Sequence, residues 1–335
     1  MDIILAMDYL CCPRCHGTLE EDPDEGNCFS CAACGVLFPM YEGHANFAAS
    51  GDLDEFSQWQ RDIYDGKVGS VCPPDYADPE GARMHNEHCM DIAGRVGLIQ
   101  PNWKGLKSRQ IIDRLLPREG ELVLDVGCGL GTLLSTLHRI YRTRGVGIDF
   151  SHAGMKAAIS SNPCDNDYHV ADALMLPFRD ESFDLAVSYD VIEHVTDPRR
   201  FVSEMSRVLK PGGRLLIYTP SRSDRWTWHW WERLFLRGRY NLGVDNLAGH
   251  DPDMFLMPDE LSGYLADEGL VDIHTEVFHT LFTLILDEVY PMFIYRLFDR
   301  PALLKAVFRL LETADAPVAD RGFGNGFFAL AWKDG

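Results

Sequence analysis

Residues 122–133 have the sequence LVLDVGCGLGTL, in which a strand-like apolar run ends at Asp125 and three glycines follow at alternate positions. Glycine permits tight turns and lets the backbone approach a ligand closely. A turn of this kind between a strand and a helix is typical of α/β proteins that bind a nucleotide at the helix N-terminus. The stretch therefore predicts a nucleotide-binding turn.

From Glu121 onward, strand-like and helix-like segments alternate along the chain. Such alternation implies a parallel sheet with helices on both faces. We therefore expect an α/β fold with a Rossmann-like, doubly wound and mostly parallel sheet. The expected strands are 121–127, 144–150, 168–173, a strand beginning at 182, 214–220, 271–278 and 326–333, and the expected helices are 131–140, 153–161, 198–213 and 257–270.

Two segments of different composition precede this region, and an insertion interrupts it. Residues 1–48 are rich in cysteine and lack helical periodicity, which predicts a small separate domain. Residues 49–118 have helical periodicity around a Pro/Gly-rich loop, which predicts a helical linker or lid. The domain at 119–335 is expected to carry a Trp/Arg-rich insertion at about 221–250.

The glycine spacing argues against a dinucleotide. A dinucleotide fingerprint has Gly-x-Gly-x-x-Gly, but the glycines here are at 127, 129 and 131, and Thr132 stands where the third glycine is expected. A carboxylate at Asp125 would also repel a pyrophosphate. The loop is better suited to a ligand with an ammonium group and no phosphate.

Four ordered segments resemble class I S-adenosylmethionine-dependent methyltransferases. They are LDVGCGLG, GVGIDFS, ADALMLPFRDESFDLAVSYDVIEHVTDP and RVLKPGGRLLIYTP, and together they cover residues from about 121 to 220. The resemblance implies that the fold is that of a class I methyltransferase, that the cofactor is S-adenosylmethionine and that the reaction is methyl transfer.

The resemblance also assigns roles to individual residues. Asp125, Gly127 and Gly129 would surround the methionine part of the cofactor, and Gly131 would complete the turn. Cys128 lies in the same loop as a small packing residue and is included among the cofactor-binding residues.

Further residues are expected along the rest of the cofactor. Asp149, followed by Phe150, would accept hydrogen bonds from the ribose hydroxyls. Asp172 and Ala173 would contact the adenine, and Tyr189 would face the site of methyl delivery. An aspartate at a strand end can also cap the following loop, so each carboxylate has a structural alternative.

The N-terminal cysteines form two C-x-x-C pairs, Cys12 with Cys15 and Cys31 with Cys34, separated by fifteen residues. This spacing suits four thiolates around a structural Zn²⁺. Cys11 could replace Cys12, and Cys28 could pair with Cys31. The segment resembles zinc ribbons fused to some methyltransferases, in particular the leader of a bacterial ribosomal RNA guanine methyltransferase, and such a ribbon either stabilises the N-terminus or recognises substrate.

Three residues are candidate general bases: Glu193, His194 and His250. The first two stand in YDVIEHV, which is similar to the EHV block of ubiquinone-biosynthesis-type methyltransferases. The third stands in AGHDPDMFLMPDEL, which looks like a second block of that subfamily. A methyl acceptor with an oxygen nucleophile often needs such a base, although Glu193 and His194 could instead organise the loop.

The insertion combines tryptophan with arginine, and it has three interpretations. The residues are Trp226, Trp228, Trp230 and Trp231 among Arg222, Arg225, Arg233, Arg237 and Arg239. This combination suits a membrane interface, stacking on unpaired bases or a lid over the acceptor. Together with the apolar stretch 278–286, it favours a small lipophilic or aromatic acceptor and a peripheral membrane contact.

Charge argues against a nucleic-acid substrate. The formal net charge is -20, and residues 1–100 carry 18 acidic and 5 basic residues, which repel phosphate. An RNA methyltransferase that uses the ribbon to hold RNA is the alternative function. The chain shows no signal-peptide pattern, and its cysteines suit a reducing compartment, so a cytoplasmic location, or a peripheral one at a membrane, is expected.

Overall fold

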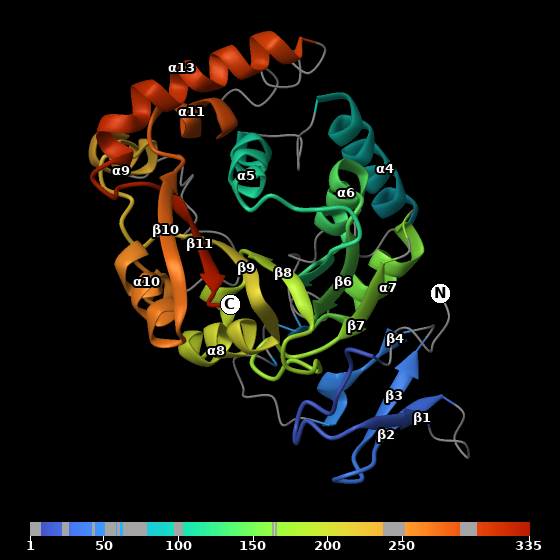
Figure 1. The fold of residues 1–335 in the computed structure, drawn as a ribbon. Helices are drawn as coiled ribbons and strands as arrows, with labels where there is room; N and C mark the ends of the chain where they lie inside the picture. The colour runs from blue at the N-terminus through green and yellow to red at the C-terminus, as the bar shows by residue number, and fades with distance from the viewer. Residues whose placement is uncertain are drawn as a thin grey trace.

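The computed structural model describes residues 8–21, 27–41, 44–50, 58, 61–62, 79–96, 103–162, 164, 166–236, 252–288 and 300–335. A seven-stranded sheet with helices on both faces forms the main body, and a four-stranded sheet lies beside it (Figure 1). Across these ranges, none of the helices has both the length and the apolar character needed to span a membrane.

The large sheet has the strand order β10-β11-β9-β8-β5-β6-β7. Neighbours from β9 to β7 pair in parallel, whereas β11 pairs antiparallel with both β9 and β10. This arrangement confirms the expected mostly parallel sheet. The strands are β5 (Leu122–Val126), β6 (Arg144–Asp149), β7 (Asp167–Val170), β8 (Phe183–Tyr189), β9 (Leu209–Pro220), β10 (Leu270–Phe278) and β11 (Gly326–Lys333).

Two apolar cores cover the two faces of this sheet, because successive side chains of a strand point to opposite faces. Val123 lies in one core and Leu124 in the other. The first face is covered by α4 (Pro79–Val96), α5 (Trp103–Arg114), α6 (Thr132–Tyr141), α7 (His152–Ser161) and α13 (Pro301–Ala319). The other is covered by α8 (Pro198–Val208) and α10 (Pro258–Asp267). Figure 1 shows these two layers on either side of the strands.

One helix ends earlier than the sequence suggests. Residues 198–213 are expected to be helical up to Pro-Gly-Gly, but α8 ends at Val208 and β9 begins at Leu209. Leu209 is fully buried and pairs with Phe183 of β8. The burial of this leucine against the sheet therefore ends the helix before the proline does.

The small sheet comprises β1 (Leu19–Glu21), β2 (Cys28–Cys31), β3 (Leu37–Tyr41) and β4 (His44–Ala45), all antiparallel, and a short 3₁₀ helix η1 (Phe47–Ser50) follows. We call residues 8–50 the ribbon. It docks onto β7 and the connection after it, where Asn46 bridges Val170 and Leu10 bridges Phe178. Several ribbon side chains belong to the same apolar core as the large sheet: Tyr9, Leu10, Cys12, Leu19, Phe29, Cys31, Phe38, Ala45 and Phe47.

The ribbon occupies a place where an α/β fold often has a crossover helix. The connection 171–182 between β7 and β8 is described throughout and contains no helix. Phe178 in this connection is fully buried, and its ring lies 6.0 Å from that of Tyr9. The ribbon thus supplies the apolar layer on this part of the sheet.

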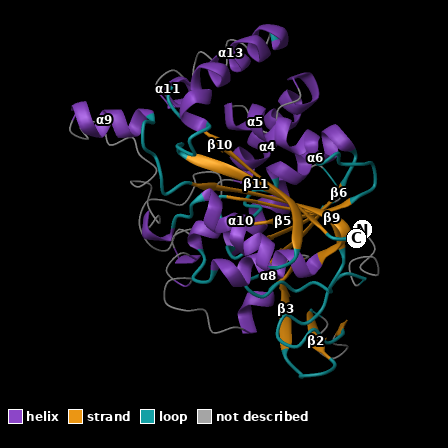
Figure 2. Ribbon diagram, turned by 60° about the vertical axis from the view of Figure 1, so that its left-hand side comes forward, coloured by secondary structure: helices purple, strands orange, loops and turns teal. Residues whose placement is uncertain are grey.

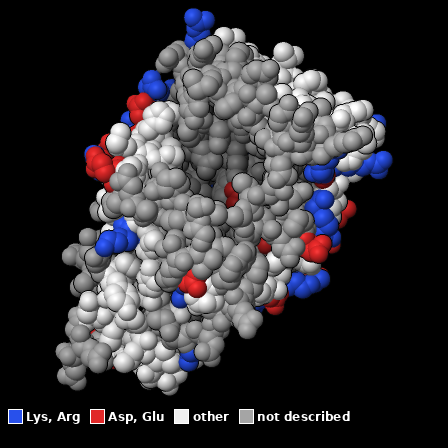
Figure 3. Space-filling model, turned by 180° about the vertical axis from the view of Figure 1, so that it is seen from behind, with Lys and Arg blue, Asp and Glu red and all other residues white. Residues whose placement is uncertain are grey.

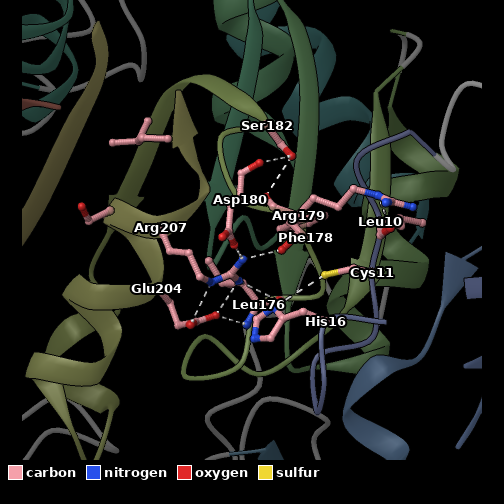
Figure 4. A network of polar contacts seen from close by, with 12 residues as sticks. Leu10, Cys11, His16, Leu176, Phe178, Arg179, Asp180, Ser182, Glu204 and Arg207 are labelled. Atoms are coloured by element: carbon pink, nitrogen blue, oxygen red, sulfur yellow. Dashed lines mark hydrogen bonds and ion pairs between the residues drawn. The ribbon is translucent and has the colours of Figure 1, made fainter. Parts of the chain in front are cut away.

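A half-buried arginine, Arg207, fixes the connection on which the ribbon docks (Figure 4). Arg207 of α8 donates to the carbonyl oxygens of Phe178 (2.7 Å) and Leu176 (3.2 Å) and to the Glu204 carboxylate (2.8 Å). Glu204 also accepts from the Leu176 backbone N–H at 2.9 Å. The backbone N–H of Cys11 then donates to Pro177 at 2.9 Å, which attaches the ribbon to this network.

Candidate functional site

The glycine loop joins β5 to α6, and its backbone requires glycine. Gly127, Gly129 and Gly131 have φ values of 80°, 50° and 69°, a region that other residues rarely adopt. A Cβ on Gly127 would lie 2.1 Å from Cγ2 of Val191, and one on Gly131 would lie 2.1 Å from the Tyr168 hydroxyl. The side chains of Val191 and Tyr168 therefore pack directly against the predicted loop and leave no room for a Cβ at these two glycines.

Asp149 ties this loop to the end of β6. Its Oδ2 accepts from the Gly129 backbone N–H at 3.1 Å, and its Oδ1 accepts from that of Ser151 at 2.9 Å. The N–H groups of Gly127 and Cys128 both donate to the carbonyl oxygen of Ile148, at 2.8 and 2.9 Å. Each carboxylate oxygen keeps acceptor capacity for a ribose hydroxyl.

Asp125 is buried at the carboxyl end of β5, with 2% of its surface exposed. Burial, and then the negative charge of Asp149, raise its pKa to about 8. A cation in this site would favour the ionised form and offset the cost of burial. The pair of carboxylates therefore suits a ligand with an ammonium group. Burial also raises the pKa of the Cys128 thiol, which is consistent with a packing residue.

The residues predicted to contact adenine and ribose follow β6 and β7. Asp172 is half-buried and caps its own turn, since its Oδ1 accepts from the Leu174 N–H at 2.8 Å. Its neighbour Ala173 is also half-buried. The carbonyl oxygen of Phe150 accepts from Nε of Arg61 at 3.1 Å. These residues thus flank Asp149 at the same edge of the sheet.

Tyr189 ends β8 and lies in an aromatic group. Its ring is 5.9 Å from that of Tyr218 and 6.2 Å from that of Phe328. Burial raises the pKa of its hydroxyl. The next residue, Asp190, has a φ of 54°, so the chain turns sharply at the end of the strand.

The structure places two of the three candidate bases. Glu193 and His194 lie in the short 3₁₀ helix η2 (Ile192–His194). Glu193 has 1% of its surface exposed, and its Oε2 accepts from the Thr219 hydroxyl of β9 at 3.1 Å. His194 is half-buried. His250 lies outside the described residues, as do Arg237 and Arg239 of the insertion.

One residue at this site is not predicted from the sequence. Asn86 of α4 is fully buried, and its Nδ2 donates to the carbonyl oxygen of Leu130 and to the Ser161 hydroxyl, both at 2.9 Å. Its Oδ1 accepts from the Thr132 hydroxyl. The side chain thus fixes the glycine loop from the helical region 49–118. A single asparagine in an amphipathic helix gives no local signal of this role.

The second site is a cluster of four cysteines in the ribbon. The Sγ atoms of Cys12, Cys15, Cys31 and Cys34 all lie within 4.8 Å of one another. The Cys12–Cys34 and Cys15–Cys31 pairs are separated by 3.7 and 3.5 Å. Sulfurs around a tetrahedral Zn²⁺ at about 2.3 Å would be separated by about 3.8 Å. The cluster therefore has the ligand type and spacing of a structural zinc site.

The turn within each C-x-x-C pair directs backbone N–H groups at the first sulfur of that pair. Burial by itself raises the pKa of the Cys31 thiol, but the N–H groups of Cys34 and Ala33 and the neighbouring thiols lower it to about 7. Gly35 has a φ of 70°. A Cβ on Gly17 would lie 2.8 Å from that of Ala33 and 3.0 Å from the Cys31 sulfur.

The two alternative cysteines lie outside this cluster. Cys11 is fully buried where the ribbon meets the connection 171–182, and its sulfur is 3.9 Å from Nδ1 of His16. Cys28 is buried in β2, in register with Pro39. Within the described ranges, the set of cysteines that converge is the one expected from the glycine-containing turns.

The aromatic insertion forms α9 (Trp228–Leu236), which projects beyond the sheet (Figure 2). The rings of Trp226, Trp230 and Trp231 contact one another in tilted and edge-to-face arrangements, with ring centroids 4.6–5.4 Å apart. Phe235 stacks on Trp231 at 5.3 Å and is 69% exposed. Beside α9 lies α11 (Phe282–Glu288), which in turn contacts α13. Part of the insertion therefore presents aromatic side chains to the surface.

The face opposite the view of Figure 1 is hollowed, and an acidic side chain is visible inside the hollow (Figure 3). A cavity of about 730 Å³ lies between α5, β10 and α13 and is lined by residues such as Lys107, Glu276 and Asp315. None of the predicted cofactor-binding residues lines it. We therefore place the candidate cofactor site at the carboxyl ends of β5, β6 and β8 and not in this cavity.

Residues 124–217 match the family model of the methyltransferase domain. The chain contains a class I S-adenosylmethionine-dependent methyltransferase domain. Curated relatives include a ubiquinone biosynthesis O-methyltransferase of Bartonella tribocorum, 31% identical over 162 residues that cover 48% of this chain and 64% of that protein. Another is the mitochondrial ubiquinone biosynthesis O-methyltransferase of Dictyostelium discoideum, 30% identical over 44% of this chain and 49% of that protein. The chain thus spans about half to two thirds of the length of these relatives.

Among solved structures, the methyltransferase fold is matched by phosphoethanolamine N-methyltransferase 2 of Haemonchus contortus, in complex with phosphomonomethylethanolamine and S-adenosylhomocysteine. The TM-score is 0.50 and the identity 19%, over 84% of this chain and 61% of that one. This likeness concerns the fold alone.

Proposed function

We propose that this protein transfers a methyl group from S-adenosylmethionine to a small lipophilic or aromatic acceptor. The observation that carries the proposal is the buried carboxylate of Asp125 near Asp149, at the start of a glycine loop whose Gly129 N–H donates to Asp149. Asp125 would bind the cofactor's ammonium group and Asp149 the ribose. Bound S-adenosylmethionine would supply an electrophilic methyl group on a sulfonium.

The chain's own contribution to catalysis would be to orient the acceptor and exclude water. In-line displacement requires the nucleophile, the methyl carbon and the sulfur to be collinear in a dry site. Tyr189 and its aromatic neighbours would form an apolar wall of this site. Glu193, His194 and His250 stay the candidate bases. For Glu193, the hydrogen bond to Thr219 favours the role of organising the loop.

The acceptor class is supported by two features. The matched relatives named above include ubiquinone biosynthesis O-methyltransferases, which cover the domain but not the whole chain. The half-buried tryptophans at α9 and the exposed Phe235 beside them suit an acceptor that is delivered from a lipid surface. The strongly acidic first hundred residues oppose RNA as the substrate.

The test is a transfer assay with methyl-labelled S-adenosylmethionine in a cleared lysate of the source cell, followed by separation of organic-solvent, RNA and protein fractions. We expect label in the organic fraction, and none with the Asp149→Ala variant as a control. Label in RNA would overturn the acceptor class and identify the ribbon as a recognition module. An absence of label in all fractions, with no binding of the cofactor, would overturn the methyltransferase activity itself.

We further propose that the four-cysteine cluster binds a structural Zn²⁺ and that α9 and α13 lie against an anionic membrane surface. On α9, Leu234 and Phe235 are 55% and 69% exposed, and on α13 Leu310 is 68% exposed beside Arg309. Exposed apolar side chains next to cations suit a lipid interface. This arrangement would make the protein cytoplasmic and membrane-peripheral.

Vesicle co-sedimentation tests the membrane contact. The chain should bind vesicles that contain phosphatidylserine more strongly than phosphatidylcholine vesicles, and Phe235→Asp should weaken this binding. Met84→Asp on α4 is the matched control, because Met84 is 60% exposed on another helix. Equal binding by both variants would contradict the assignment of α9.

A further inference from the structure

The ribbon contacts both ends of β7, and the two ends differ in what lies next to them. At the amino end of the strand, the Tyr9 hydroxyl donates to Asp167. At the carboxyl end, Asn46 bridges Val170. Val170 is also the register partner of Asp149, the expected ribose ligand. The carboxyl-end contact is therefore adjacent to the cofactor site, and the amino-end contact is not.

Asn46 also reaches the helix that follows Asp149. Its Nδ2 lies 3.1 Å from Nε2 of His152, the first residue of α7. Its Oδ1 accepts from the Ala48 backbone N–H at 3.1 Å, which assigns the oxygen and leaves the amide nitrogen facing His152. The amide therefore donates, and His152 accepts through an unprotonated Nε2. Asn46 is 4% exposed and His152 is half-buried, so this contact is partly shielded from water.

The start of α7 in turn fixes Asp149. Ser151, the N-cap of α7, donates its backbone N–H to Asp149 Oδ1 at 2.9 Å, and its hydroxyl accepts from the Gly154 N–H at 3.1 Å. The carbonyl oxygen of Asp149 accepts from the Ala171 N–H at 3.0 Å. A shift of the first turn of α7 would therefore move the Asp149 carboxylate relative to the glycine loop.

The position of Asn46 depends on the ribbon as a whole. Its backbone N–H donates to the carbonyl oxygen of Pro39 at 2.9 Å, and β3 pairs with β4 immediately before it. β3 also pairs with β2, which carries Cys31 of the cysteine cluster. A continuous set of hydrogen-bonded strands thus links the cysteine cluster to the contact with α7.

We propose that Asn46 is a positioning residue through which the folded ribbon holds the first turn of α7, and with it Asp149, in the geometry that binds the cofactor's ribose. This inference rests on the proposed function, since it concerns the same cofactor site. It gives the ribbon a role beyond covering the sheet, because loss of the ribbon's fold would weaken cofactor binding without removing any residue that touches the cofactor.

The test measures S-adenosylhomocysteine binding to the full chain by titration calorimetry, well below the melting temperature. Asn46→Ala should weaken binding about three- to tenfold, the factor that corresponds to one hydrogen bond. His152→Ala removes the other partner of the same contact. Because both variants break one contact, the double variant should bind S-adenosylhomocysteine no more weakly than the single variant with the lower affinity. Backbone hydrogen exchange of residues 149–154 should accelerate in both single variants.

Tyr9→Phe is the matched control. It removes the hydrogen bond at the far end of β7, so it should lower the melting temperature and leave the dissociation constant unchanged. Unchanged affinity and exchange in Asn46→Ala, with normal binding by the unmodified chain, would overturn the inference alone. A weakening by Tyr9→Phe equal to that by Asn46→Ala would reduce Asn46 to a general stabilising role and also overturn it. An unmodified chain that does not bind S-adenosylhomocysteine would overturn the proposed function.

Discussion

The cysteine cluster of the ribbon and the glycine loop of the methyltransferase domain are built from similar parts. The Cys31–Cys34 turn follows β2 and the glycine loop follows β5, and each turn contains glycine with positive φ, such as Gly35 at 70° and Gly127 at 80°. In the ribbon, backbone N–H groups point at sulfurs that also converge on one another. Beside the glycine loop, burial and then the negative charge of Asp149 raise the pKa of Asp125 to about 8.

The two sites differ in what satisfies their charged groups, which are thiolates in the ribbon and carboxylates beside the glycine loop. Four thiolates around one ion would satisfy each other's charge, so the ribbon needs nothing further from solvent or substrate. A buried carboxylate and a half-buried one, Asp125 and Asp149, repel each other when both are ionised and are best satisfied by a cationic ligand that enters and leaves. A site of the first kind, which is closed, stabilises the fold. In a site of the second kind, which is open to a ligand, the repulsion between the carboxylates is relieved when a cationic ligand binds, and this relief favours binding.

The largest expected effect would break the closed site. Cys31→Ser should unfold the ribbon, because structural Zn²⁺ in zinc-finger peptides contributes about 10–16 kcal/mol of apparent binding free energy. Metal content by mass spectrometry and near-ultraviolet circular dichroism measure the loss. Cys28→Ser is the control, since Cys28 lies outside the cluster and should leave one metal ion per chain. Metal loss in Cys28→Ser instead would contradict the ligand assignment.

The next effect concerns how the ribbon is attached to the domain. Arg207→Leu leaves Glu204, 2% exposed, with Arg200 at 3.1 Å as its remaining arginine partner, and should cost about 1.5–3 kcal/mol in the free energy of unfolding, the range for a hydrogen bond to a charged group. Arg199→Leu breaks an exposed ion pair with Asp267 and should cost less than about 1 kcal/mol. Urea unfolding compares the two. If the two variants lose similar amounts of unfolding free energy, the hydrogen-bond network of Arg207 stabilises the protein no more than an exposed ion pair does.

A third variant damages the open site alone. Gly127→Ala forces a Cβ to within 2.1 Å of Val191 at a positive φ. We expect S-adenosylhomocysteine affinity to fall by at least about 100-fold, two tenfold steps of about 1.4 kcal/mol each, while the ribbon keeps its metal. Gly120→Ala is matched in backbone, with a φ of 81°, but has no atom within 4 Å of the added Cβ. It should cost about 1–2 kcal/mol of stability and leave binding unchanged.

The smallest effect is a pH dependence that is specific to the open site. Because the folded pKa of Asp125 is about 8, a proton must leave when a cationic cofactor binds below that pH. Affinity should therefore rise with pH up to about 8, by at most about tenfold per unit, and then level off. Asp125→Asn should flatten this rise. A slope that persists in the variant would assign the proton to another group.

The same shift has the opposite sign for the stability of the ligand-free chain. A carboxyl whose folded pKa is raised holds a proton that the unfolded state has lost, so its contribution to stability falls as pH rises from about 4 to 8. Thermal melting with and without S-adenosylhomocysteine should thus diverge as pH increases. Parallel curves would show that Asp125 does not couple the two states.

Much of the fold and of the candidate site follows from local sequence. The glycine loop, the strand ends at Asp125 and Asp149 and the C-x-x-C pairs are each defined within a few residues, and so are visible without a structure. Alternating strands and helices similarly predict the mostly parallel sheet. The extent of β9 is different, because Leu209 is drawn into the strand by its burial against β8.

Residues that act across long sequence separations could not be predicted in this way. Asn86 contacts the glycine loop from 44 residues away, and Asn46 meets His152 from 106 residues away. An asparagine in a helix or after a short strand has no distinctive local pattern. Its role depends on which backbone groups are buried beside it, and only the packed chain shows that.

The sequence by itself determined the class of fold, the turn at the cofactor site and two cysteine pairs at metal-binding spacing, because each depends on backbone geometry or chemistry within one short segment. The tertiary structure decided which four cysteines converge, that β11 enters antiparallel between β9 and β10, and that the ribbon docks at β7 beside Asp149. These outcomes depend on the burial of side chains from distant segments against one another, a free energy that no single segment contains.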